Sequence, residues 1–382
     1  MRNAPSVLQV DPSLFTAPYD AALTAGLAAA GVRVAWATRG LRRQEEADLP
    51  PGEPSLTCYR LSDGRNRRTG LVGRVIKGCE HLLDLRRIER LAMSGGFDLV
   101  HFQWAIMPMF DIAAMQRIRR ERPVVLTVHD VTPFNGAGVS ALQRRGFDRL
   151  FAAADHLIVH TEGARASLIA RGARTDAISV IAHGPLALRR LPQASASRQS
   201  DRWRVVLFGR LQSYKGIDVL IEALGLLSGT DRQRLEVIVA GDPLFDIAPL
   251  VQRAEALGLG APLLQMIPRR LDEQAMADLL GSADSFVFPY RAIEASGVLF
   301  LVSGLNRWLI ASNLGAFADV IGHDDTLGCL VEPGNPAELA TALIDSIGRV
   351  PARSAEMSGW DQIGEQTLAL YRKVLARHGR PA

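Results

Sequence analysis

The segment from Arg204 to Leu224, RVVLFGRLQSYKGIDVLIEAL, constrains the fold more than any other part of the chain. It begins with a short apolar run, Val205 to Phe208, which has the length and composition of a buried strand. After a loop, apolar residues recur at positions i, i+3, i+4 and i+7, as in an amphipathic helix: Ile217, Leu220, Ile221 and Leu224. A buried strand followed at once by such a helix is typical of a parallel sheet with crossover helices.

The loop between this strand and this helix contains Gly209, Arg210 and the pair Lys215-Gly216. In open α/β sheets, ligands bind outside the carboxyl ends of the strands. A helix N-terminus beside two cations suits a phosphate group. We therefore expect an anionic ligand at this loop, with an ordinary connecting loop and solvated cations as the simpler alternative.

The same alternation of apolar runs and helical patterns extends over the whole chain. In the first half, strands are expected at Ser6–Val10, Val32–Ala37, Leu56–Arg60, Asp98–Phe102, Val124–Val128, His156–His160 and Ile178–Ala182. In the second half, they are expected at Val205–Phe208, Leu235–Ala240, Leu263–Ile267, Ser285–Phe288, Leu309–Ala311 and Cys329–Val331. Helical patterns fill the intervals, which predicts an α/β protein with two Rossmann-like, doubly wound parallel-sheet domains facing a central cleft.

Composition suggests where the two domains meet. The stretch RRLPQASASRQSDR between residues 189 and 202 is small, polar and without periodicity, as linkers are. We expect an N-terminal domain of residues 1–190, a linker of residues 191–203 and a C-terminal domain of residues 204–355. Residues 356–382 contain a further apolar helical pattern with no strand to pair with, and are expected to pack back on the N-terminal domain.

Charge and cysteine content narrow the class of protein. Residues 1–190 carry 26 Lys and Arg against 18 Asp and Glu, whereas residues 191–382 carry 18 Lys and Arg against 22 Asp and Glu. The basic first half is consistent with an anionic partner, and equally with ordinary charged helix faces exposed to solvent. The three cysteines stand far apart, which indicates neither a disulfide framework nor a zinc site and fits a reducing cytoplasm. The first residues lack the apolar stretch of a signal peptide, and no run is long enough to span a membrane.

The second-half motifs FGRLQSYKGIDVLIEAL and SADSFVFPYRAIEASGVLFLVSGLNRWLIASNLGAFADVI resemble the retaining GT-B glycosyltransferases of family 4 (glycosyl transferases group 1). A weaker resemblance runs through TVHDVTPF and ADHLIVHTEGARASLIARG in the first half. The resemblance implies a nucleotide-sugar donor bound to the C-terminal domain and an acceptor bound to the N-terminal domain. It also implies sugar transfer in the cleft with no cofactor and no essential metal.

The resemblance assigns donor-binding residues to the C-terminal domain. Arg210 and Lys215, beside Gly209, match the cations that hold the donor diphosphate, and cations aimed at a departing diphosphate stabilise the transition state. Glu294 matches a catalytic glutamate that contacts the donor sugar. The further donor-binding assignments are Ile267 and Arg269 at the nucleobase, and Ser296, Gly297 and Val298 at the phosphates, where a plain helix N-cap is the structural alternative. Val302 stands where a second, ribose-binding glutamate is expected, so ribose recognition departs from the family pattern.

The N-terminal domain is expected to supply His129 and the acceptor site. His129 matches a histidine beside the donor sugar, and we assign it to positioning and polarising; a core histidine is the alternative reading. Asp11, Tyr19, Gln103 and Trp104 are assigned to acceptor binding, because they follow a predicted strand or lie in the loop DPSLFTAPYD. His183 is assigned to the same site because His183-Gly184 resembles the family's HG pair after the last strand of this domain. No GxGxxG fingerprint follows the first strand, which disfavours a dinucleotide-dependent oxidoreductase.

The segment from Arg60 to Arg90 combines nine basic residues with aliphatic ones, the composition of a helix that lies on a membrane surface. The residues concerned are Leu71, Val72, Val75, Ile76, Leu82, Leu83 and Leu85 with Arg65, Arg67, Arg68, Arg74 and Lys77. We therefore expect a cytoplasmic, peripheral enzyme that transfers a hexose from a GDP- or UDP-sugar to a lipid-linked oligosaccharide or polysaccharide acceptor, as in cell-surface glycan synthesis. A soluble acceptor, or a nucleotide-sugar-binding partner subunit without turnover, is the alternative.

Overall fold

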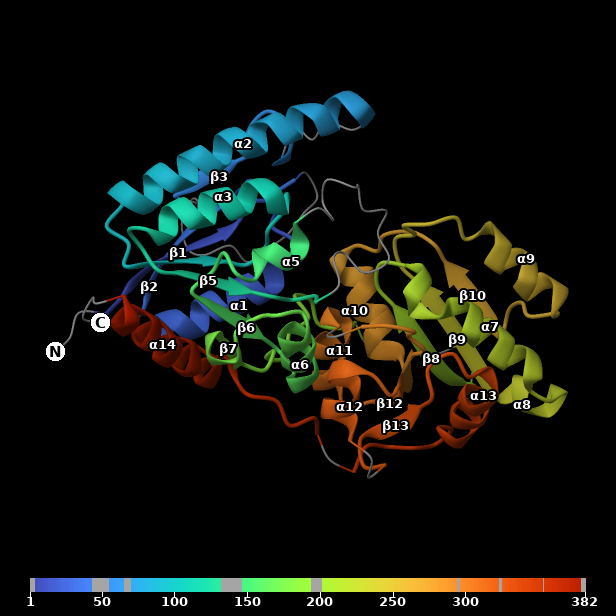
Figure 1. Cartoon of the computed structure of the whole chain (residues 1–382). Helices are drawn as coiled ribbons and strands as arrows, with labels where there is room; N and C mark the ends of the chain where they lie inside the picture. Colours follow the sequence, from blue (N-terminus) through green and yellow to red (C-terminus); the bar gives the residue numbers. More distant parts are fainter. Residues whose placement is uncertain are drawn as a thin grey trace. The chain divides into compact units, whose positions relative to one another are not determined.

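The computed structural model describes residues 4–42, 55–64, 70–131, 146–193, 201–293, 296–322, 325–352 and 354–378. The chain forms two compact units (Figure 1). The N-terminal unit combines residues up to Gly184 with the C-terminal segment from Ser358, and the C-terminal unit spans Pro185–Met357.

The N-terminal unit is built on a parallel sheet of seven strands in the order β3-β2-β1-β4-β5-β6-β7. These strands are β1 (Ser6–Asp11), β2 (Arg33–Arg39), β3 (Leu56–Cys58), β4 (Leu99–Phe102), β5 (Val124–Thr127), β6 (His156–Val159) and β7 (Ile178–Val180). One apolar face packs on α2 (Gly70–Ser94), α3 (Pro108–Arg119), α5 (Phe147–Leu150) and α6 (Glu162–Ala170), and the other on α1 (Ala17–Ala29) and α14 (Trp360–Arg377). The strand order reverses between β1 and β4, so the loops after these strands diverge there.

The C-terminal unit repeats this plan with six parallel strands in the order β10-β9-β8-β11-β12-β13. The strands are β8 (Trp203–Phe208), β9 (Leu235–Ala240), β10 (Leu264–Ile267), β11 (Ser285–Phe288), β12 (Trp308–Ser312) and β13 (Gly328–Val331). Helices α7 (Ile217–Leu226), α9 (Ala248–Ala256) and α13 (Pro336–Asp345) cover one face; α10 (Glu273–Ser282), α11 (Gly297–Val302) and α12 (Gly315–Ile321) cover the other. The short α8 (Gly229–Arg234) precedes β9. The switch point lies between β8 and β11.

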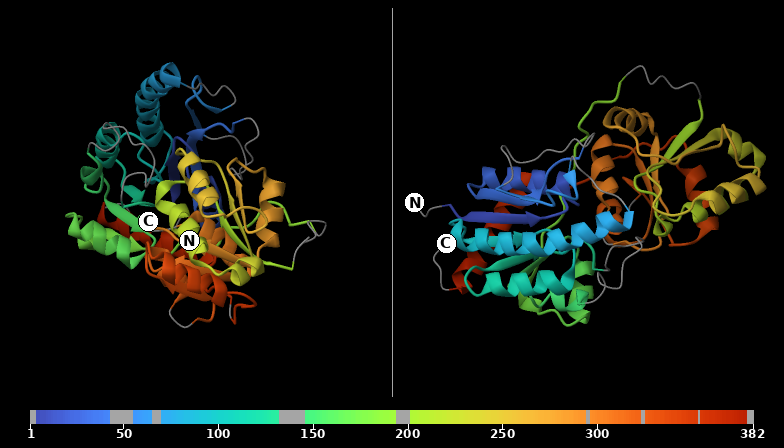
Figure 2. Two further views of the ribbon diagram at one scale, coloured as in Figure 1. Left: turned by 90° about the vertical axis from the view of Figure 1, so that its right-hand side faces the viewer. Right: turned by 90° about the horizontal axis from the view of Figure 1, so that it is seen from above.

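Helix α14 returns to the N-terminal unit (Figure 2). It packs against α1, and the two helices cross at glycines. A Cβ atom at Gly364 would lie 2.2 Å from the Gly26 carbonyl oxygen, and one at Gly26 would lie 2.0 Å from the Trp360 oxygen. Only glycine at both positions lets the two backbones approach this closely.

The predicted strands form within one or two residues of their expected ends, which confirms the two doubly wound sheets. The boundary between the halves differs from the expected residue 190. The chain passes to the C-terminal unit after Gly184, because Leu186 N donates to Phe300 O (3.0 Å) and Gln193 N donates to the Asp278 carboxylate (2.8 Å). The predicted linker of residues 191–203 overlaps the C-terminal sheet at its last residue, because β8 begins at Trp203.

Candidate active site

The loop after β8 is held tightly against its neighbours. Gly209 has φ +111°, a conformation that disfavours any residue with a Cβ atom. A Cβ atom there would lie 2.8 Å from Lys215 Nζ and 2.9 Å from the Val298 side chain. Gly209 therefore brings together the lysine and the start of α11, two groups that the sequence assigned to donor binding.

Lys215 is a buried cation with only 4% of its surface exposed. Its Nζ donates to Phe208 O (3.1 Å) and lies 5.0 Å from the centroid of the Tyr290 ring. Burial, with a smaller contribution from the charge of Arg210, lowers the pKa of Lys215 to about 7. Among the residues described, no carboxylate pairs with this ammonium group, so an anionic ligand would be its first counter-ion.

The backbone around Lys215 fixes its position. Gly216 adopts φ +67° between the 3-10 turn Ser213–Lys215 and α7. A Cβ atom at Gly216 would lie 1.8 Å from Pro289 O, so the start of α7 packs directly against the segment after β11. Arg210, by contrast, is exposed and can turn toward a ligand.

The other predicted donor residues lie at the same edge of the sheet. Ser296 is the N-cap of α11 and accepts from Leu299 N (3.4 Å), which leaves Gly297 exposed at the helix start. Ile267 ends β10 and its carbonyl accepts from Gly241 N (3.1 Å), while Arg269 is exposed. Glu294 lies outside the described residues, and its assignment stays a prediction.

In the N-terminal unit, the loop after β1 contains a buried pair of carboxyl groups. Asp11 and Asp20 are fully buried, and Thr16 donates to both, from its N to Asp11 (3.3 Å) and from its hydroxyl to Asp20 (3.3 Å). Burial raises the pKa of both groups, and the charge of Asp11 raises that of Asp20 further. Asp11 is therefore buried within its loop, and its assignment to acceptor binding stays a prediction.

Three other predicted residues gather around His129. The His129 ring stacks on Trp104 (centroids 5.5 Å apart, 16°) and meets the edge of Tyr19 (4.8 Å). His183 lies 4.9 Å from Tyr19 and is buried, as is Gln103. The structure therefore groups Tyr19, Trp104, His129 and His183, which come from the loops after three strands and from α1.

Sequence reasoning missed His160, which bridges this group. Its Nε2 lies 3.2 Å from His129 Nδ1, and its Nδ1 lies 3.0 Å from Ile181 O. The signal was available, because both histidines follow adjacent predicted strands. His101 of β4 is fully buried between the Tyr371 hydroxyl (2.7 Å) and the Thr127 hydroxyl (2.8 Å).

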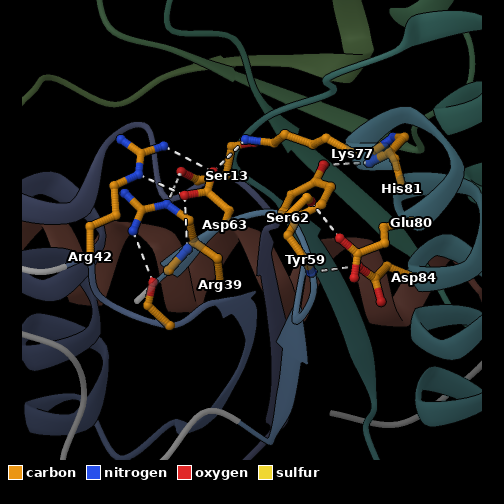
Figure 3. Close-up of polar contacts among 12 residues, drawn as sticks. Ser13, Arg39, Arg42, Tyr59, Ser62, Asp63, Lys77, Glu80, His81 and Asp84 are labelled. Carbon is orange, nitrogen blue, oxygen red and sulfur yellow. Dashed lines mark hydrogen bonds and ion pairs between the residues drawn. The ribbon is translucent and has the colours of Figure 1, made fainter. Parts of the chain in front are cut away.

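A second polar network surrounds Asp63 at the carboxyl ends of β2 and β3 (Figure 3). Arg42 binds both oxygens of Asp63 (2.7 and 2.9 Å), and Lys77 of α2 reaches the same carboxylate (2.6 Å). These cations hold the pKa of Asp63 below its usual range although burial opposes them. Lys77 also lies 4.6 Å from the centroid of the Tyr59 ring, so it ties α2 to the sheet and is not free for other partners.

The described residues contain no cluster of His, Cys, Asp and Glu that could hold a metal ion. They also include no helix long and apolar enough to cross a membrane.

Two family models match the chain, one in each half. Residues 21–184 match the model described as Glycosyltransferase Family 4, and residues 202–348 match the model described as Glycosyl transferases group 1. The chain belongs to the family 4 glycosyltransferases. The resemblance to the family 4 glycosyltransferases that the sequence showed is confirmed.

Individual relatives agree with this assignment. The glycosyltransferase is 24% identical over 393 residues to D-inositol 3-phosphate glycosyltransferase of Paenarthrobacter aurescens (strain TC1), covering 94% of this chain and 92% of the relative. The fold of this chain is similar to that of sucrose-phosphate synthase from Thermosynechococcus elongatus (TM-score 0.66, 18% identity, 98% of both chains). It is also similar to Anabaena HepE in complex with UDP-glucose (TM-score 0.64, 18% identity, 97% and 95% of the chains). Together with the two parallel sheets, these likenesses show the GT-B fold.

Proposed function

We propose that this glycosyltransferase transfers a hexose from a UDP- or GDP-sugar whose diphosphate binds at Arg210 and Lys215. The observation that carries the proposal is the burial of Lys215 at the switch point of the C-terminal sheet, with no carboxylate partner among the residues that the structure describes. Structures of HepE with UDP and with UDP-glucose support a uridine nucleotide as the donor. The departing nucleoside diphosphate gains negative charge, which a fixed cation stabilises most in the transition state.

The remaining donor residues take the roles that the resemblance implies. The backbone N–H groups of residues 296–298 bind the phosphates, Glu294 contacts the sugar, and residues 267–269 contact the base. His129 of the N-terminal unit positions the sugar. Transfer proceeds with retention at the anomeric carbon, and Arg210 and Lys215 supply the positive charge at the diphosphate without a cofactor.

Thermal-shift measurements with UDP-, GDP-, ADP- and dTDP-sugars test the donor. A ligand at about 100 times its Kd adds about 2.7 kcal/mol of stability, which a melting curve resolves. We expect a clear shift with the UDP- or GDP-sugars and release of the free diphosphate on prolonged incubation. Absence of any shift with all four donors would contradict the proposal, and a shift without slow release would favour a binding subunit.

Diphosphate binding should be accompanied by proton uptake. The pKa of Lys215 is lowered to about 7 in the free protein, and a bound anion raises it again. About one pH unit above that value, Lys215 is mostly neutral when free and becomes protonated on binding, so one proton enters per nucleotide. Calorimetric titration of UDP in buffers of different ionisation enthalpy measures this uptake.

The Lys215→Met variant serves as the control for proton uptake, because it keeps a long side chain but cannot titrate. Its proton uptake should disappear while weak nucleotide binding remains.

The lowered pKa of Lys215 also predicts how stability depends on pH in the unliganded wild-type protein. The free energy of unfolding should rise with pH between about 7 and the ordinary lysine pKa of 10.5, because the unfolded chain binds the additional proton there.

We further propose that α2 attaches the enzyme to an anionic membrane surface, where a lipid-linked acceptor resides. Part of the inner face of α2 is polar: Glu80, His81 and Asp84 are buried, and each bonds to the N-terminal unit. They lie beside the buried apolar residues Leu85, Ile88 and Ala92. The outer face is apolar, with exposed Leu71, Val72, Val75, Leu82 and Leu83. The exposed charged residues of α2 are Arg74, Arg86 and Arg90, all basic.

The exposed apolar residues support a bilayer over a solvated helix face. Hydrogen bonds of the buried polar residues fix the orientation of α2 and keep these apolar residues on its outer face. Apolar side chains flanked by arginines suit the interface of an anionic bilayer. Leu85, which the sequence grouped with the membrane residues, is instead in the core, and Lys77 pairs with Asp63; Arg65, Arg67 and Arg68 lie outside the described residues.

Co-sedimentation with vesicles containing phosphatidylglycerol tests this attachment. We expect binding that weakens as added salt shortens the Debye length from about 10 Å at 0.1 M to about 3 Å at 1 M. The triple substitution Leu71→Ser, Val75→Ser, Leu83→Ser should reduce binding by at least about tenfold, because each exposed aliphatic chain contributes on the order of 1 kcal/mol on burial.

The matched control replaces three exposed apolar residues of the C-terminal unit, Leu191→Ser, Leu226→Ser and Val350→Ser. This variant should bind vesicles like the wild type. Equal sedimentation of both triple variants would contradict the assignment to α2.

A small phosphorylated polyol is the second candidate acceptor, favoured by the name of the Paenarthrobacter relative. Transfer to inositol phosphate in the absence of lipid, unaffected by the α2 substitutions, would support it over the lipid-linked acceptor.

A further inference from the structure

His160 follows β6 and makes a hydrogen bond that determines where its proton lies. Its Nδ1 lies 3.0 Å from the carbonyl oxygen of Ile181, and a carbonyl oxygen can only accept. Nδ1 therefore carries the hydrogen. Burial lowers the pKa of His160 to about 4, with the bond to Ile181 opposing, so the ring is neutral near neutral pH and its Nε2 carries a lone pair.

That lone pair determines the tautomer of His129. His160 Nε2 lies 3.2 Å from His129 Nδ1, and because Nε2 accepts, His129 Nδ1 must donate. Burial and the neighbouring histidines hold the pKa of His129 well below its usual range, so this ring is neutral as well. The hydrogen is therefore on Nδ1, and His129 Nε2 is an acceptor.

His129 Nε2 has no hydrogen-bond partner among the described residues, although it is buried. The ring cannot easily rotate to find one, because it stacks on Trp104 and meets the edge of Tyr19. The Tyr19 hydroxyl in turn bonds to Thr127, the last residue of β5. A buried acceptor held in one orientation without a donor indicates a donor that arrives with a ligand.

We propose that His160 is a positioning residue, which holds His129 in the Nδ1–H tautomer so that its Nε2 accepts a hydrogen bond from a substrate hydroxyl. The identity of this hydroxyl as one of the transferred sugar rests on the proposed function. The tautomer and its cause rest only on the contacts of His160 with Ile181 and His129. Without His160, either nitrogen of His129 could carry the hydrogen, and the Nε2–H form would present a donor where an acceptor is needed.

Heteronuclear NMR of the imidazole nitrogens in the full-length protein tests the tautomer directly. In the wild type we expect His160 and His129 both as Nδ1–H tautomers. The His160→Phe variant keeps the ring volume but removes the acceptor, so His129 should gain the Nε2–H form and kcat/KM should fall by about tenfold or more. The His160→Gln variant can still donate to Ile181 O and accept from His129, and should restore both the tautomer and most of the activity.

His156 provides the matched control, since it begins β6, the strand that His160 follows, is buried, and bonds to Ser179 (2.9 Å). His156→Phe should leave the His129 signals and kcat/KM unchanged. Melting curves of every variant measure any change in stability separately. An Nε2–H tautomer for His129 in the wild type, or loss of activity in His160→Phe with an unchanged His129 tautomer, would overturn the proposal. If the tautomers are as expected but no nucleotide sugar is turned over, the proposed function fails and the positioning role of His160 stands.

Discussion

The Lys215→Ala variant is expected to lose two or more orders of magnitude in turnover, about 2.7 kcal/mol or more of transition-state stabilisation. Lys215 is held by Phe208 O beside the Tyr290 ring, with an exposed arginine and the start of α11 as its neighbours. A buried ammonium has lost most of its hydration before the ligand arrives, so its attraction to the departing diphosphate is strong. Steady-state kinetics with a UDP- or GDP-sugar measures the loss.

Lys373→Ala is the matched control for Lys215→Ala, because Lys373 is an exposed lysine of α14. It should retain full activity. Circular dichroism and melting curves should show the Lys215→Ala protein folded, and more stable than the wild type if anything, since a buried cation has been removed. Near-normal turnover by folded Lys215→Ala would remove the diphosphate assignment.

The Gly364→Val variant is expected to separate α14 from α1 and to lower the unfolding temperature of the N-terminal unit strongly. Even a Cβ atom would lie 2.2 Å from Gly26 O and 2.9 Å from Leu27 N, which are backbone atoms that cannot move aside alone. Overpacking of this kind costs about 1–3 kcal/mol, and a β-branched side chain adds to it. Differential scanning calorimetry should show the loss in one of two transitions, because two compact units need not unfold together.

Gly78→Ala provides the comparison, since Gly78 lies within α2 and a Cβ atom there meets nothing within 4 Å. Alanine in an open helical position should be neutral or stabilising by about 0.5–1 kcal/mol. If Gly364→Val melts like the wild type, the close crossing of α1 and α14 does not hold the C-terminal helix in place.

The sequence by itself determined the two doubly wound sheets and the position of the donor loop. Both depend on local patterns: apolar runs of strand length, helical periodicity, and the residues between them, as in the segment from Phe208 to Ile217. Because a strand and the helix that follows it are neighbours in the chain, their order predicts the parallel sheet directly. The family resemblance added roles to residues that this local pattern had already placed.

Only the tertiary structure decided which side chains meet and which are buried. Residues Tyr19, His129, His160 and Ile181 are far apart in the chain, and the order of β1, β5, β6 and β7 in the sheet brings them together. Asp11 looked like a polar loop residue, but its partner Asp20 and their joint burial depend on how α1 packs.

The orientation of α2 shows the same division. Its composition predicted an amphipathic surface helix, yet nothing in the sequence tells that Glu80, His81 and Asp84 face inward. Their hydrogen-bond partners come from other elements: Leu61, Ser62, Tyr59 and Asp111. A buried carboxylate such as Glu80 or Asp84 is stable only where neighbouring groups donate hydrogen bonds to it. Burial and pairing are properties of neighbours in space, so the sequence determined the elements of this protein, whereas the packing decided which of their faces touch.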